Sequence, residues 1–297
     1  MKSWIKVRTP GSCGELIQGF YGEQEMLISY PINLYSEVTF SKAEQTCGEP
    51  LGRKAQQAVA LFFELTKMTT DLLESYELSV QNNIPVGKGM ASSTADICGV
   101  LNGLYYLYEL PVDEEEIAKI CCLIEPTDST VFRQISLFDH INGSHIESFD
   151  WALECDVLVL EPDYQINTTD FRRAKKEQLM RKNHDSQALS VFRRAVKEKS
   201  YALLCESTYL SAKENQEILE KPYLDVLQDI ALSHGCYGVN VAHSGSVVAI
   251  LLNKETVDVK VLMQTIEESA ISSYYKKYYM TKIISGGSQI MEGTTCL

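Results

Sequence analysis

Hydrophobic and polar residues form short alternating runs along the first eighty residues, interrupted once by a longer helical pattern. Alternation with a period of two predicts half-buried strands, whereas apolar residues that recur every three or four positions predict a helix. We therefore expect strands near 4–9, 26–30, 34–40 and 77–81, and a helix over about 53–67. This first part of the chain thus mixes strands with a helix and does not repeat any unit.

The same patterns continue to the end of the chain. Apolar residues recur at helical spacing from Ile97 to Tyr108 before Pro111, and the acidic run 113–116 favours a second helix through 124, since carboxylates complement a helix N-terminus. The remaining patterns predict a buried strand at 155–160, helices within 170–219, a hairpin of 239–243 with 247–252, a helix at 256–269 and a closing strand at 274–285. No regular βαβ period emerges, which favours an α+β architecture.

Composition limits the class of protein. With 297 residues, of which 45% are hydrophobic, the chain can bury a core in one large or two moderate domains. A formal charge of −13 argues against a general nucleic-acid or anionic-membrane partner, and it favours packing rather than nucleic-acid binding for the tyrosine-rich run 274–279. Nine cysteines without a Cys-x-x-Cys pattern, no signal peptide and no membrane-length apolar run predict a reduced, cytoplasmic protein.

The segment 85–94 is the most informative part of the chain. Two glycines and a pair of serines separate a polar stretch from the helix that starts near residue 92. Backbone N–H groups at a helix N-terminus, reached through glycines, form a site for phosphate. An ordinary N-cap after a glycine turn is the other interpretation. The spacing matches neither a Walker A loop nor a dinucleotide-binding fingerprint.

Four segments together resemble a known family. Pro-Gly-Ser-Cys-Gly-Glu-Leu at 10–16, Gly-Met-Ala-Ser-Ser-Thr-Ala-Asp at 89–96, Glu-Pro-Thr-Asp-Ser at 125–129 and Ala-His-Ser-Gly at 242–245 follow in the order found in the GHMP kinases. Within that superfamily they are most similar to the branch that phosphorylates L-threonine in cobalamin biosynthesis. The resemblance implies an N-terminal, ATP-binding domain like ribosomal protein S5 over 1–153 and a ferredoxin-like C-terminal domain over 154–297.

The resemblance also implies roles for individual residues. Asp128 occupies the place of a catalytic aspartate that accepts the acceptor's hydroxyl proton, and Glu125 with Ser92, or with Ser93, would hold Mg²⁺. ATP would bind residues of the glycine loop and of a later small-residue turn. The expected ATP-binding residues are Pro85, Gly87, Lys88, Gly89, Met90, Ala91, Ser92, Ser93, Thr94, Ser244, Gly245 and Ser246.

The small-molecule acceptor, expected to be L-threonine, would lie against the first motif and the start of the helix. Its expected contacts are Ser12, Cys13, Gly14, Glu15, Gln18 and Asp96. Many relatives carry a cation at the position of Ser12, so another residue has to supply it here. Lys88 and Arg8 are the nearest candidates in sequence, and Lys88 is therefore our second expected catalytic residue.

Several alternatives stay open at this point. Homoserine kinase activity is the nearest, because both acceptors are small hydroxy amino acids. A nucleotide or metabolite sensor on the same fold is the alternative of another class, because a fold does not guarantee activity. Cys13 as a nucleophile with a histidine base is disfavoured, since no nucleophile-elbow motif surrounds it. The sequence does not indicate an oligomeric state.

Overall fold

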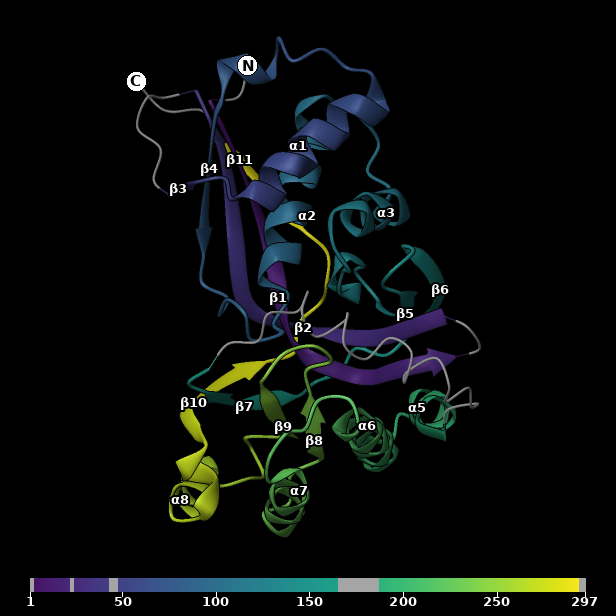
Figure 1. The fold of residues 1–297 in the computed structure, drawn as a ribbon, viewed down its shortest axis with the longest axis vertical. Helices are drawn as coiled ribbons and strands as arrows, with labels where there is room; N and C mark the ends of the chain where they lie inside the picture. The colour runs from purple at the N-terminus through teal and green to yellow at the C-terminus, as the bar shows by residue number, and fades with distance from the viewer. Residues whose placement is uncertain (1–2, 22–23, 43–47, 165–186, 294–297) are drawn as a thin grey trace.

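The computed structural model describes residues 3–21, 24–42, 48–164 and 187–293. Its strands form one sheet of eleven strands in the order β10-β7-β9-β8-β1-β2-β4-β3, with β11 beside β1 and the pair β5–β6 beside β2, and the neighbouring strands pair antiparallel. Figure 1 shows an upper and a lower lobe, with β1 and β2 running from one into the other. Helices therefore cover two connected parts of one sheet, as an α+β architecture requires.

The strands β1 (Trp4–Tyr21) and β2 (Gln24–Ser41) connect the lobes. They pair antiparallel along most of their length, and the register shifts between Pro10 and Ser12, between Ser12 and Glu15, and between Glu15 and Ile17. Irregularities of this kind bend a strand and redirect its side chains. The first motif, which begins at Pro10, is therefore not a loop but the bent middle of a long strand.

The upper lobe packs three helices against the sheet. These are α1 (Arg53–Thr66), α2 (Ser92–Leu107) and α3 (Glu114–Ile124). Apolar faces of the three helices meet Val38 and Phe40 of β2 in one buried cluster. The Asp113 side chain accepts hydrogen bonds from the N–H groups of Glu115 and Glu116, which fixes the start of α3.

Short strands complete the upper part of the sheet. They are β3 (Glu49–Pro50), β4 (Glu77–Asn82), β5 (Ile135–Asp139), β6 (Ser144–Phe149) and β11 (Gln289–Gly293). Single-turn 3₁₀ helices lie at Leu73–Ser75, Ser129–Val131 and Ala270–Ser273. Because β11 pairs with the first residues of β1, the last described residues return to the upper lobe.

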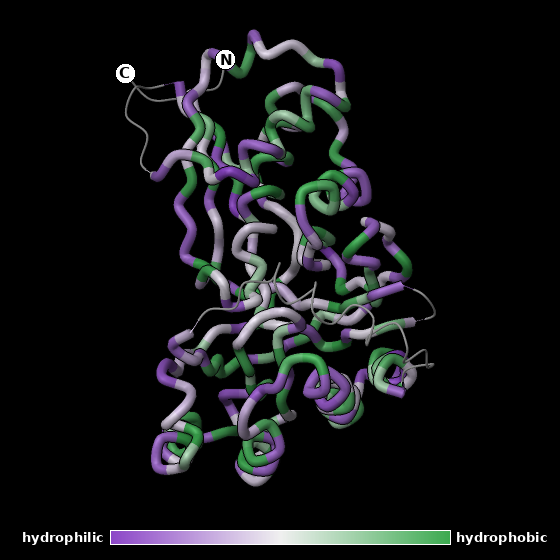
Figure 2. Tube along the Cα trace, in the orientation of Figure 1, coloured by the Kyte–Doolittle hydropathy of each residue, from purple (hydrophilic) through white to green (hydrophobic). Residues whose placement is uncertain are grey.

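The lower lobe consists of β7 (Asp156–Pro162), β8 (Gly238–Val241), β9 (Val248–Leu252) and β10 (Tyr275–Lys282), with helices on one face. The helices are α5 (Gln187–Glu198), α6 (Tyr201–Gln216), α7 (Leu224–Ser233) and α8 (Val259–Glu267). Figure 2 shows hydrophobic and hydrophilic residues side by side on these helices, as expected where one face covers a sheet. No helix among the described residues combines the length and the apolar character needed to cross a membrane.

Most elements that the hydrophobic pattern predicts are confirmed within a few residues, among them the helix over 53–67, the hairpin and the closing strand β10. The expected strands over 4–9, 26–30 and 34–40 are too short, since they are parts of β1 and β2. The pattern missed β3, β5, β6, α7 and β11. The first part of the helical region expected over 170–219 lies outside the described residues.

Candidate active site

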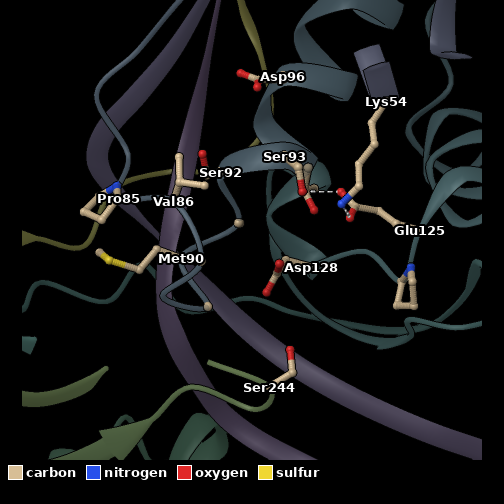
Figure 3. A pocket seen from close by; sticks show the side chains of 15 residues that line it. Lys54, Pro85, Val86, Met90, Ser92, Ser93, Asp96, Glu125, Asp128 and Ser244 are labelled. Atoms are coloured by element: carbon tan, nitrogen blue, oxygen red, sulfur yellow. Dashed lines mark hydrogen bonds and ion pairs between the residues drawn. The ribbon is translucent and has the colours of Figure 1, made fainter. Parts of the chain in front are cut away.

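A pocket of about 330 Å³ opens where the lobes meet, at the N-terminus of α2 (Figure 3). Most residues that the motifs predicted as ligands line it. These are Pro85, Gly87, Gly89, Met90, Ala91, Ser92, Ser93, Thr94, Asp96, Glu125, Asp128 and Ser244. Lys54, Val86 and Pro126 complete the lining. The fold thus brings the glycine loop, the acidic motif and the later small-residue turn to one place.

The glycine loop reaches α2 through left-handed backbone conformations. Gly87 and Gly89 have φ values of 71° and 78°, and Ala91, the N-cap residue, has φ 59° and makes no side-chain capping bond. The first backbone N–H groups of a helix have no intrahelical acceptor, and the helix dipole places positive potential there. The wall formed by Ser92, Ser93 and Thr94 therefore suits an anion such as a phosphate group.

The first and third motifs hold this loop by backbone contacts. The Ser12 N–H donates to the Met90 carbonyl at 3.0 Å, and the Ser246 N–H donates to the Lys88 carbonyl at 3.0 Å. A Cβ atom on Gly245 would lie 2.1 Å from the Lys88 carbonyl oxygen and 2.3 Å from the Gly89 Cα. Gly245 and Ser246, expected as ATP ligands, do not line the pocket, and they position the loop instead.

The basic side chain in the pocket is Lys54, not Lys88. The Lys88 ammonium points away from the pocket and donates hydrogen bonds to the carbonyls of Pro162 and Tyr164. Arg8, the other cation considered, stacks on the Tyr35 ring at 3.6 Å. Lys54, at the start of α1, forms an ion pair with Glu125. The structure thus does not bring Lys88, expected as the missing cation, into the pocket.

Glu125 and Ser93 converge in the same corner. The Ser93 hydroxyl donates to Glu125 Oε1, and Lys54 binds Oε2 of the same carboxylate (Figure 3). The Ser92 hydroxyl faces the other way and accepts from the Asn82 side chain at 3.1 Å. Of the two serines considered, Ser93 is thus the one beside Glu125. A carboxylate and a hydroxyl together are the hard oxygen donors that Mg²⁺ prefers.

Asp128 faces the pocket from the wall across from the glycine loop and the N-terminus of α2. Its Oδ1 accepts a hydrogen bond from the Ser29 hydroxyl at 3.2 Å, and its carboxyl group also shares a hydrogen bond with Glu15. Burial raises the pKa of Asp128, while the hydrogen bonds from Ser29 and Glu15 oppose that shift. A carboxylate with a raised pKa is a stronger base than an exposed aspartate, as proton abstraction from a hydroxyl requires.

Glu15 lies behind Asp128 rather than in the pocket. Burial, and after it the charge of Asp128, raises the pKa of Glu15 well above its usual range. The Glu15 carboxyl also accepts a hydrogen bond from the His243 N–H. The hydrogen bond between the two carboxyl groups raises the pKa of Glu15 and lowers that of Asp128, so Glu15 is the partner that holds the shared proton and donates the hydrogen bond.

The other expected substrate contacts fall into two groups. Asp96 lines the pocket, and its Oδ1 is already bound by the Ser36 hydroxyl and by the Asn82 side chain at 2.7 Å. Ser12, Cys13, Gly14 and Gln18 do not line it, because β1 places them in the interior. Burial raises the pKa of the Cys13 thiol far above its usual value, which excludes the thiolate nucleophile considered from the sequence.

Lys54 is the charged pocket residue that sequence reasoning missed. One signal pointed to it: a lysine in the first turn of a helix opposes the helix dipole, so it needs an acidic partner. The partner, Glu125, comes more than seventy positions later and belongs to another motif. The amino-acid sequence alone therefore does not indicate that Lys54 pairs with Glu125.

Comparisons with known proteins agree with this geometry. The family model for the GHMP kinases N terminal domain matches residues 53–132, and the model for the GHMP kinases C terminal domain matches residues 192–261. The chain is 34% identical over 284 residues to the L-threonine kinase of Salmonella typhimurium, covering 95% of this chain and 94% of that protein. It is 33% identical over 291 residues to the L-threonine kinase of Citrobacter freundii, covering 95% and 98%.

Among solved structures, a homoserine kinase from Cytophaga hutchinsonii superposes with a TM-score of 0.67 at 12% identity, covering 98% of each chain. This likeness concerns the fold alone. The α+β fold that the motifs implied is confirmed, whereas the boundary between 153 and 154 stays a prediction. On the near full-length similarity to the two bacterial kinases and the two matching family models, the chain belongs to the GHMP kinase family.

Proposed function

We propose that the protein transfers the γ-phosphoryl group of ATP to the side-chain hydroxyl of L-threonine. The observation that carries the proposal is that one pocket holds both a helix N-terminus suited to phosphate and, across from it, the partly buried carboxylate of Asp128. Two relatives that are 34% and 33% identical along nearly the whole chain are L-threonine kinases. The product would be O-phospho-L-threonine, which the sequence resemblance assigns to cobalamin biosynthesis.

ATP would place its phosphates on the backbone of residues 87–94 and beside Lys54. Phosphoryl transfer depends on positioning and on neutralising the charge of the phosphates, which the helix N-terminus and a lysine both favour. Ser93 and Glu125 fit Mg²⁺, since their oxygens converge at the mouth of the same loop. When bound there, Mg²⁺ would supply further charge neutralisation, and Lys54 would keep Glu125 oriented toward the phosphates.

Asp128 would act on the acceptor. It would accept the proton of the threonine hydroxyl while the hydroxyl oxygen forms a bond to the γ-phosphorus and the bond between that phosphorus and the β,γ-bridging oxygen breaks, which releases ADP. Glu15, protonated, would donate a hydrogen bond to Asp128 and keep it ionised before the reaction. Ser29 would fix the orientation of the carboxylate through Oδ1.

A coupled assay of ADP release with a panel of amino acids tests the proposal. L-Threonine should support turnover, L-serine and L-homoserine should support less, and L-valine, which has the shape of threonine without the hydroxyl, should support none. When an analogue lacks the hydroxyl, the polar groups of the site that bind it are left without a hydrogen-bond partner. Discrimination of about 10⁴-fold between L-threonine and L-valine is therefore attainable. Phosphothreonine formation is confirmed by mass spectrometry.

The two alternatives give different results in the same assay. A clear preference for L-homoserine would reject L-threonine as the substrate and retain the kinase. Nucleotide binding by calorimetry without ADP release for any acceptor would support a sensor on this fold.

A further inference from the structure

A second cluster of chemically active side chains lies beside the pocket, and the reaction above does not use it. His243 follows β8, His140 follows β5, and Glu25 lies near the start of β2. Nε2 of His243 is 2.7 Å from Oε1 of Glu25, and Nε2 of His140 is 3.7 Å from the same oxygen. Both histidines are buried, and the Glu25 side chain is 15% exposed.

A neighbouring amide fixes the tautomer of His243. The Gln18 amide nitrogen donates to the Val241 carbonyl, so its oxygen Oε1 is the acceptor. That oxygen receives the Asn215 amide at 2.9 Å and faces His243 Nδ1 at 2.9 Å. Nδ1 therefore carries the ring hydrogen of neutral His243. The lone pair is left on Nε2, directed at the Glu25 carboxylate.

Two acceptors at 2.7 Å repel each other unless a cation or a further proton lies between them. A metal-binding histidine is commonly oriented in this way, by a hydrogen bond from its other ring nitrogen. All three candidate ligand atoms lie within 4.8 Å of one another. Ligand atoms on one tetrahedral Zn²⁺ are separated by about 3.3 Å, given bonds of about 2.0–2.2 Å, so small side-chain adjustments would suffice.

We propose that Glu25, His140 and His243 form a Zn²⁺-binding site that is distinct from the nucleotide pocket. Two imidazoles and one carboxylate, with a fourth position for water, are a common donor set for this ion. The ion would tie together the start of β2, the turn after β5 and the turn between β8 and β9. That last turn also contains Ser244, a wall of the nucleotide pocket, so bound metal would steady one side of it.

The test uses the full chain, stripped of metal with a chelator and then titrated with Zn²⁺ by calorimetry and against a chromophoric indicator. We expect saturable binding of one ion per chain and a thermal unfolding temperature that rises with Zn²⁺. Glu25→Gln and His140→Gln should each weaken binding by at least tenfold, by analogy with the cost of altering metal-site partners. His145→Gln, a change outside the cluster, should bind as the wild type does.

Further measurements distinguish this site from a Mg²⁺ site and from metal binding by the cysteines. Excess Mg²⁺ should not displace the ion, because imidazole is a poor ligand for Mg²⁺. Co²⁺ should give the visible spectrum of nitrogen and oxygen ligands without a thiolate charge-transfer band, which excludes binding by the cysteines. No saturable binding at micromolar Zn²⁺ would overturn the proposal and leave a proton between His243 and Glu25. Equal binding by the wild type and both cluster variants, each shown to be folded by circular dichroism, would overturn it as well.

Discussion

Asp128 carries the proposed proton transfer, and Asp128→Asn isolates that role because the amide keeps the size of the side chain and can still accept from Ser29. General-base contributions are typically about 10²–10⁴-fold, so kcat should fall by that factor. The affinity for ATP, measured by calorimetry, should change little because the loop backbone still holds the phosphates. If the variant keeps its rate, Asp128 only stabilises the turn. If ATP·Mg²⁺ affinity falls together with the rate, Asp128 is a metal ligand.

Glu15 provides a sharper test of the carboxyl pair. Burial and then Asp128 raise the pKa of Glu15, and in the hydrogen bond between the two carboxyl groups Glu15 is the donor. Glu15→Gln retains a donor toward Asp128 and an acceptor for the His243 N–H, so kcat and the acid limb of its pH profile should stay close to wild type. Glu15→Ala removes a bond to a charged group, worth about 1.5–3 kcal/mol, and should cost about tenfold or more in kcat/KM.

An ionised Glu15 would give a different result for Glu15→Gln. If Glu15 were ionised, the glutamine would relieve repulsion on Asp128, lower the pKa of Asp128 and shift the acid limb to lower pH. A large downward shift in Glu15→Gln would therefore contradict the neutral-donor interpretation.

The residues of the site also show where prediction from sequence ends. Thr94, Glu125 and Asp128 were placed in the pocket because they belong to compact motifs. The direction of a lysine side chain is set by tertiary contacts, and Lys88 binds carbonyls of Pro162 and Tyr164, more than seventy residues away. Sequence proximity to the loop was therefore a poor guide to which cation reaches the pocket.

At the scale of elements, the glycine loop depends on its contact with the turn between β8 and β9. Gly245→Ala would place a methyl group against the backbone of Lys88 and Gly89, which cannot rotate away as a side chain does. The loop must move, and misplacement of about 1 Å can cost about 10²-fold. We expect kcat/KM for ATP to fall tenfold to about hundredfold. Thermal unfolding should show that the protein stays folded.

Gly52→Ala is the matched control for this change. No atom lies within 4 Å of a Cβ at Gly52, which is the N-cap residue of α1. Alanine is a poorer N-cap than glycine, so this change should cost about 1 kcal/mol of stability or less and leave the KM for ATP unchanged. Equal losses in both variants would mean that the contact with Gly245 does not set the loop conformation.

The elements differ in how well the sequence predicts them. The helix that begins at Ser92 has a local signal, because a glycine loop precedes it and apolar residues recur along it. β11 has little local signal. It is a short, mostly exposed strand whose position depends on the edge of β1. The full length of β1 was also missed, because its bulges interrupt the alternation on which a strand prediction relies.

At the scale of the whole molecule, a chain of buried polar groups links the lower lobe to the bent middle of β1. Lys221, 1% exposed, donates to Asn215 Oδ1 at 3.2 Å. Asn215 in turn donates to Gln18 at 2.9 Å. Burial lowers the pKa of Lys221 to about 7 from 10.5. The ammonium is thus unusually costly to keep charged in the folded protein.

The cost of keeping the Lys221 ammonium charged in the folded protein makes the free energy of unfolding depend on pH, and the sign of that dependence follows from the pKa shift. Between pH of about 7 and 10.5 the unfolded chain holds the Lys221 proton while the folded chain releases it, so this group makes stability rise with pH. Below that window the lysine is charged in both states and the full cost is present. Lys221→Met removes the titration, and its other effects, such as the lost partner of Asn215, hardly depend on pH. We therefore compare the slopes of the two proteins, not their absolute stabilities.

Denaturant unfolding of both proteins at several pH values from 7 to 9 measures those slopes. Over this range the free energy of unfolding of the wild type, relative to that of Lys221→Met, should rise by about 1 kcal/mol per pH unit. The limit for the release of one proton is about 1.4 kcal/mol per pH unit. Every other titrating group is common to both proteins and cancels in the difference. Parallel curves would mean that Lys221 keeps an ordinary pKa, which would require water or a carboxylate within reach of its ammonium. A wild type that loses stability relative to Lys221→Met as the pH rises from 7 to 9 would contradict the sign, because the folded protein releases the Lys221 proton in this range while the unfolded chain keeps it.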